Sequence, residues 1–113
     1  MSKAVKAIKI LCNETDDDEV DELFMFANGQ RFWPNSDDGI VQMVAGTEHG
    51  VNSPLYELDG GNVRFSLRDD ESPLGSDSLG WVDVSANASE GIHEEVFDPG
   101  DGYYVLTYKV IEF

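Results

Sequence analysis

The chain has 113 residues, and its 23 acidic side chains against 7 basic ones give a formal net charge of −16. Apolar residues make up 41% and aromatic residues 11% of the sequence, which is enough for a packed core and excludes a disordered acidic tail. A field of this sign repels nucleic-acid backbones and anionic membranes, so we expect neither as a partner. The length is typical of one domain, and we expect residues 1–113 to form one.

The amino-terminal segment "MSKAVKAIKILC" predicts a strand rather than a targeting signal. Its apolar part is short and is interrupted by Lys6 and Lys9, unlike a signal h-region. No apolar run approaches the ~20 residues that span a bilayer. We therefore expect a cytoplasmic chain, the mature form of a secreted one, or a chain exported by a route that needs no such signal. Cys12 is the only cysteine, which excludes an intrachain disulfide and a thiolate zinc site, and we expect it in the core.

Short segments rich in β-branched and aromatic residues alternate with glycine and proline along the rest of the chain. This spacing is typical of an all-β sandwich or barrel. We expect a single antiparallel β-sandwich of about eight strands, formed by residues 4–12, a hairpin over 22–34, and segments 40–44, 54–58, 63–67, 81–85, 94–97 and 103–113.

The hairpin has the strongest local signal. Asn28-Gly29 joins two apolar runs, and this pair is favoured in two-residue type I′ turns. A helix over residues 16–26 is an alternative, because Thr15 could cap it and Val20, Leu23 and Phe24 would share one face. The Asn28-Gly29 turn favours a strand over this helix, because a hairpin turn needs a strand immediately before it.

Two acidic segments are candidate metal-binding loops. The first, "TDDDEVDE" at residues 15–22, places six acids in eight positions. Carboxylates this close repel one another, so they need solvent, a counter-ion or a binding partner around them. The second, "RDDESPLGSDSLGW" at residues 68–81, places Asp69 and Glu71 two apart and Asp77 six further on. Residues two apart in a strand share one side, and Ca²⁺ takes six to eight oxygen ligands from such loops.

The second segment resembles the third calcium loop of C2 domains, in which Asp-x-Asp is followed by a third Asp and then a Gly before the next strand. The first segment is similar to the first calcium loop of that family. The resemblance implies a C2-like sandwich that binds one or two Ca²⁺ ions without catalysis. The ligands that we expect are Asp16, Asp21, Asp69, Glu71 and Asp77, with Asp18, Glu22 and Asp70 as neighbours.

The chain departs from the C2 pattern in two ways. Glu71 stands where the family usually has Asp, which lengthens that ligand arm. The chain also lacks the basic patches of C2 domains that dock on membranes, and only Val20, Pro73 and Leu74 could serve as apolar loop tips. We therefore expect calcium binding without membrane docking.

Other metal sites and enzyme classes find no support in the sequence. An EF-hand starting at Asp17 would need Gly at its sixth position and Glu at its twelfth, where the chain has Glu22 and Asn28. The "HEE" at residue 93 lacks the second His of a zinc-protease helix. No nucleophile elbow or phosphate loop occurs, and a small sandwich offers little cleft for a glycosidase pair, so we expect no enzyme.

Three alternatives to a calcium module remain open. The acidic surface could bind a basic protein partner without metal, as a nucleic-acid-mimicking inhibitor does. The charge could reflect adaptation to high salt, since acids are scattered over the whole chain. The two acidic segments could also be ordinary solvated turns.

Overall fold

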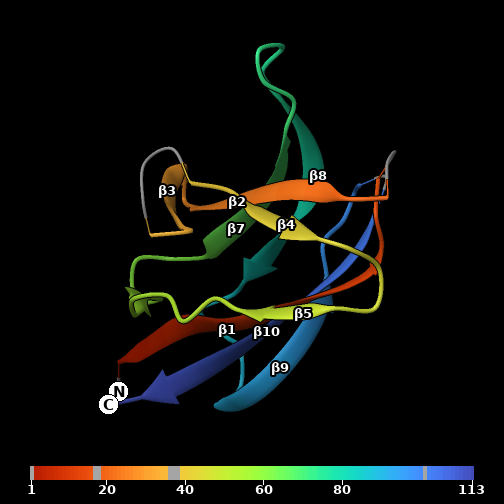
Figure 1. The fold of residues 1–113 in the computed structure, drawn as a ribbon. Helices are drawn as coiled ribbons and strands as arrows, with labels where there is room; N and C mark the ends of the chain where they lie inside the picture. The colour runs from red at the N-terminus through yellow and green to blue at the C-terminus, as the bar shows by residue number, and fades with distance from the viewer. Residues whose placement is uncertain (1, 17–18, 36–38, 101) are drawn as a thin grey trace.

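The chain folds into two antiparallel sheets that pack as a sandwich in a computed structural model, which describes residues 2–16, 19–35, 39–100 and 102–113 (Figure 1). One sheet has the order β5-β1-β10-β9, with β6 also paired to β1. Its strands are β1 (Lys3–Glu14), β5 (Glu48–Gly50), β6 (Tyr56–Glu57), β9 (Gly91–Val96) and β10 (Tyr103–Glu112).

The second sheet has the order β3-β2-β7-β8, with β4 also paired to β2. Its strands are β2 (Asp21–Ala27), β3 (Gln30–Trp33), β4 (Val41–Met43), β7 (Val63–Asp70) and β8 (Ser76–Val84). The predicted antiparallel sandwich is therefore confirmed. Among the described residues, no helix is long and apolar enough to cross a membrane.

The β2–β3 hairpin turns at Asn28 and Gly29, as predicted. Their φ angles of 49° and 82° are both positive, which a type I′ turn requires. Asn28 also fixes the turn to β7, since its side-chain oxygen accepts the Arg64 N–H and its own N–H donates to the Arg64 carbonyl, each at 2.8 Å. The helical alternative for this region is wrong, because residues 21–27 form β2.

The core lies between the sheets and follows from alternation along the strands, which is clearest in β7. In β7, Val63, Phe65 and Leu67 are at most 1% exposed, while the residues between them face outward. Tyr104 and Leu106 of β10 meet this row from the other sheet, and the buried apolar side chains form one cluster. Cys12 belongs to it, as predicted, and burial raises the pKa of its thiol.

Two features of the strands differ from the prediction. The described residues form ten strands rather than about eight, since β5 has three exposed residues and no apolar pattern to reveal it. Residues 68–81 are also not a long loop: β7 continues to Asp70 and β8 begins at Ser76. The Arg68 side chain holds this tighter hairpin, because it donates to the hydroxyl and carbonyl oxygens of Ser76 at 2.6 and 2.8 Å.

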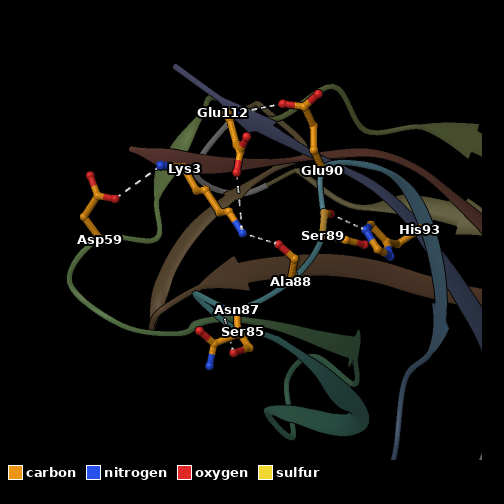
Figure 2. A network of polar contacts seen from close by, with 9 residues as sticks. All are labelled: Lys3, Asp59, Ser85, Asn87, Ala88, Ser89, Glu90, His93 and Glu112. Carbon is orange, nitrogen blue, oxygen red and sulfur yellow. Dashed lines mark hydrogen bonds and ion pairs between the residues drawn. The ribbon is translucent and has the colours of Figure 1, made fainter. Parts of the chain in front are cut away.

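Polar contacts close the end of the sandwich at which the two termini lie side by side (Figure 2). The Lys3 ammonium donates to the Ala88 carbonyl at 2.8 Å and pairs with Glu112 at 3.8 Å. The Lys3 backbone N–H donates to Asp59 at 3.2 Å. This end is therefore held by contacts of β1 with β10, with the loop after β8 and with the loop after β6. The β7–β8 hairpin projects on the side away from the termini (Figure 1).

Candidate functional site

Two buried aspartates, Asp21 and Asp69, lie on the core-facing side of the second sheet, at the end next to the acidic loops. Asp21 precedes the core residue Leu23 in β2, and Asp69 follows Leu67 in β7. Leu23 and Asp69 are register partners, so the two acids lie at the same end of the sheet. Asp21 is 1% exposed and Asp69 7%. Burying two carboxylates is costly unless donors or a cation compensate.

Hydrogen-bond donors of the protein reach only some of the carboxylate oxygens of these two aspartates. The Asp69 Oδ1 accepts the Glu22 N–H at 2.8 Å. The Asp21 Oδ2 accepts the Asp16 N–H at 2.8 Å and the hydroxyl proton of Tyr104. The Asp21 Oδ1 is buried and has no hydrogen-bond partner in the described ranges. An unsatisfied buried acceptor costs about 1–3 kcal/mol, and a bound cation would relieve that cost.

Glu71 and Asp77 extend the negative charge to the surface. Asp77 lies directly opposite Asp69 in the β7–β8 register. Partial burial raises the pKa of the Glu71 carboxyl, and the charges of Asp77 and Asp69, together with hydrogen bonds to both, raise it further, to about 7. Burial and the charge of Asp21 also raise the pKa of Asp69, against the hydrogen bond from Glu22. These carboxylates therefore repel one another and favour a shared proton or a cation.

The remaining predicted ligands are placed differently. Glu22 and Asp70 follow Asp21 and Asp69 directly, so their side chains leave the opposite faces of the strands. The Asp70 Oδ1 also accepts the N–H and hydroxyl of Ser72, at 3.0 and 2.6 Å. Asp18 lies outside the described residues. The structure thus gathers Asp21, Asp69, Glu71 and Asp77, with Asp16 joined to them through its backbone.

These carboxylates are neighbours without being a preformed cage. Throughout the part of the chain that the structure describes, no three or more His, Cys, Asp or Glu side chains are arranged to hold a metal ion. To hold a cation with the described residues alone, the surface carboxylates would need to turn toward it. Arg68, the base nearest to Asp69 along the chain, donates to Ser76 instead.

Tyr104 is the residue of this site that sequence reasoning missed. Its ring is fully buried between the sheets, and its hydroxyl reaches Asp21 from β10. Burial and the hydrogen bond to Asp21 raise the pKa of this hydroxyl, so it stays a donor. It lies 83 residues from Asp21 along the chain, and no local motif links the two positions.

Comparison with known proteins supports the fold. No family model matches the sequence, and no curated protein matches it either. Solved structures similar to this one include a C2 domain of a plant extended synaptotagmin 1, with a TM-score of 0.54 and 11% sequence identity. The match covers 99% of this chain and 95% of that one. Because the likeness extends over both chains almost entirely, this protein has a C2-like β-sandwich fold.

Proposed function

We propose that the chain is a non-catalytic calcium-binding module that takes the ion between the β1–β2 loop and the β7–β8 hairpin. The observation that carries this proposal is the Asp21 carboxylate, whose buried Oδ1 has no partner among the described residues. The proposed ligands are Asp16, Asp21, Asp69, Glu71 and Asp77, with Asp18, Glu22 and Asp70 as their neighbours in the sequence.

Calcium fits the donor set better than softer metals do. The site offers carboxylate oxygens, and a large ion with flexible coordination tolerates the longer Glu71 arm. The resemblance of the two loops to the calcium loops of C2 domains supports the same ion. Burial, together with the charges of neighbouring carboxylates, raises the pKa of Glu71 and of Asp69. A divalent cation would convert the repulsion between these carboxylates into attraction, and this would drive its binding.

Calcium would then act on the loops by stabilising the folded chain. An ion that binds only the folded state raises the free energy of unfolding by about 2.7 kcal/mol at a hundred times its dissociation constant. We expect this stabilisation to act mainly at the acidic end of the sandwich. In the metal-free protein, repulsion between the carboxylates there would keep the β7–β8 hairpin away from the β1–β2 loop.

Isothermal titration of EDTA-treated protein with CaCl₂, paired with thermal unfolding, tests this function. We expect saturable calcium binding and a rise in melting temperature, with a much smaller effect of MgCl₂ and of NaCl at matched ionic strength. Asp69→Asn and Asp77→Asn should each lose most of the affinity. Asp83→Asn is the matched control, since Asp83 lies on the same strand as Asp77 but pairs with Arg64 at 2.8 Å. Unchanged binding by both site variants would refute the proposed ligands.

A calcium-independent role of the acidic surface is the second candidate. It is favoured by the distribution of bases, since no Lys or Arg occurs in residues 10–30 or 69–108. Such a surface would bind a basic protein partner without metal, and added salt would weaken the complex. The absence of any calcium effect in the titration, together with salt-sensitive binding of a lysine-rich peptide in EDTA, would favour this role over the first.

A further inference from the structure

Strand β9 ends its sheet with an open backbone edge. It pairs with β10 over residues 91–96 without a register shift, and it is the last strand in the order β5-β1-β10-β9. Figure 1 shows it in light blue at the margin of the sandwich, beside β10. Among the described residues, none forms a backbone hydrogen bond with its other side. Such an edge can pair with a strand of another chain.

The register shows which backbone groups of β9 point to this edge. The Phe97 N–H donates to the Tyr104 carbonyl at 3.0 Å, so these two residues form a directly bonded pair. Directly bonded pairs recur at every second residue of an antiparallel ladder, so residues 91, 93 and 95 bond to β10. The N–H and C=O groups of Ile92, Glu94 and Val96 therefore point away from β10.

The same three residues present their side chains to solvent on the outer face of the sheet. They lie opposite the positions of β10 that alternate with the core residues Leu106 and Tyr108. Ile92 is 60% exposed and Val96 43%, and Glu94 between them is also exposed. One line of three residues thus offers free backbone groups together with apolar, acidic and apolar side chains.

Strand β9 lacks the features that usually protect an edge. Lysine, proline and β-bulges are common protections, but β9 has no Lys or Pro and its ladder has no shift. Strand β8, at an edge of the second sheet, differs from it. Its ladder with β7 has a register shift, and Trp81 also pairs with Asp98. A further strand can therefore add to β9 over its full length.

Glu94 determines which kind of strand can add. In the antiparallel register that places Ile92 of one copy opposite Val96 of another, the two Glu94 side chains face each other. Like charges at directly opposite positions destabilise a sheet, and the net charge of −16 on each chain adds to the repulsion. Glu94 takes part in no ion pair among the described residues. A base opposite Glu94 would turn the repulsion into attraction.

We propose that the open edge of β9 binds an extended segment of a basic partner protein as an additional antiparallel strand. The segment has Lys or Arg opposite Glu94 and apolar residues opposite Ile92 and Val96. Backbone hydrogen bonds supply the affinity and the alternate side chains supply the specificity. The site belongs to the sheet that does not contain β2, β7 and β8, so it does not depend on the proposed calcium function.

The test uses the full chain in EDTA and the fluorescein-labelled peptide Thr-Val-Thr-Lys-Thr-Val-Thr, with fluorescence anisotropy as the readout. We expect saturable, one-to-one binding that added NaCl weakens. A peptide with glutamate in place of the lysine should bind about tenfold more weakly, because repulsion replaces attraction opposite Glu94. Equal binding of the two peptides would overturn the proposal.

Backbone methylation separates strand addition from attraction between surface charges. Methylation of the backbone nitrogens of the lysine and both valines keeps the charge and the side chains but removes the N–H groups that would bond to β9. This peptide should not bind. The matched control is methylated at three threonines, whose N–H groups would point away from β9, and it should bind like the parent peptide. Undiminished binding of the first methylated peptide would overturn strand addition.

A charge reversal in the protein assigns the binding to β9. Glu94→Lys should reverse the preference, so that the glutamate peptide binds about tenfold more tightly than the lysine peptide. This gain of binding also shows that the variant is folded. Glu48→Lys is the matched control, since Glu48 is an exposed acid on β5 at the opposite edge of the same sheet. It should keep the preference for lysine. An unchanged preference in Glu94→Lys would show that β9 is not the site.

Sedimentation velocity in EDTA tests a second copy of the chain as the occupant of this edge. We expect the parent protein to be monomeric with and without the peptide, because the two Glu94 side chains oppose pairing. A parent that forms dimers and does not bind the lysine peptide would assign the edge to a second copy and would overturn the proposal.

Discussion

The hydroxyl of Tyr104 donates a hydrogen bond to the carboxylate of Asp21, and this contact joins the two sheets directly beneath the acidic loops. Tyr104 belongs to β10 and Asp21 begins β2. The bond occupies the Asp21 Oδ2 and leaves its Oδ1 without a partner among the described residues. Tyr104 therefore acts as a positioning residue: it fixes the direction in which Asp21 presents its remaining oxygen.

Replacing Tyr104 with Phe should destabilise the fold by about 1.5–3 kcal/mol, the range for a lost hydrogen bond to a charged group. The ring stays in the core, so the effect reports the hydroxyl rather than a cavity. Urea unfolding in EDTA measures it. The control is Tyr103→Phe, because Tyr103 is the preceding residue and is 45% exposed.

The same variant separates positioning from stability. If Tyr104 orients Asp21, calcium affinity should fall in Tyr104→Phe under conditions where the variant is fully folded. A variant that is less stable but binds calcium like the parent would show that Tyr104 has only a structural role.

The pH dependence of metal-free stability should report the crowding of Glu71. Its pKa is about 7 in the folded chain against an ordinary 4.5, so between these pH values the folded state binds more protons than the unfolded state. The free energy of unfolding contributed by this group therefore falls as the pH rises through that range. Asp69 contributes in the same direction, because its pKa is also raised.

Glu71→Gln should remove this penalty. The gain in stability of the variant over the parent is expected to be small near pH 4.5, to grow up to about pH 7 and then to level off, as measured by urea unfolding at each pH in EDTA. Glu94→Gln, an exposed acid on β9, is the control. A gain that does not change with pH would show that Glu71 is not crowded by Asp69 and Asp77.

Much of the fold could be predicted because the main strands carry their own signals. The alternation in "VRFSL" and the Asn28-Gly29 pair depend on local sequence, and both are correct in the structure. Strand β5 could not be predicted in this way. Its residues are all exposed, and it forms because Lys9, Ile10 and Leu11 of β1 offer it backbone partners.

The candidate site was predictable only in part, for a related reason. Alternation places Asp69 beyond Leu67 and Asp21 before Leu23, so their common direction follows from the strands. The tight β7–β8 hairpin differs from the longer loop that the sequence predicts. It places Asp69 directly opposite Asp77, although cross-strand pairs usually favour unlike charges. Contacts between Arg68 and Ser76 hold it there. The bond between Tyr104 and Asp21 depends on the packing of the two sheets, which no segment of the sequence encodes alone.

The aromatic cluster around Phe65 should be a large contributor to stability. Phe65 is 0% exposed and makes edge contacts with Phe32 and Tyr56. Phe65→Ala is expected to cost about 3–5 kcal/mol, the usual range for a truncated core phenylalanine. Phe113→Ala, at a position that is 64% exposed, should change stability by less than about 0.5 kcal/mol. Similar losses from both substitutions in urea unfolding would contradict the assignment of Phe65 to the core.

Gly100 should resist substitution because the backbone of β8 lies against it. A Cβ atom at this position would stand 2.6 Å from the carbonyl carbon of Leu79 and would also meet the Leu79 oxygen. The neighbouring backbone would have to move, and the bridge that pairs Trp81 with Asp98 lies next to this contact. Gly100→Ala should therefore destabilise the fold by about 1–3 kcal/mol, the cost of overpacking.

Thermal unfolding of Gly100→Ala beside Gly60→Ala measures this close approach. Gly60 is the control, since a Cβ there meets nothing within 4 Å, and its substitution should leave the melting temperature unchanged or slightly higher, because alanine restricts the unfolded chain. A difference between the two variants therefore reports the contact with Leu79 rather than the general effect of replacing a glycine. If Gly100→Ala melts at the temperature of the parent, the 97–100 segment does not pack against β8 as closely as the structure places it.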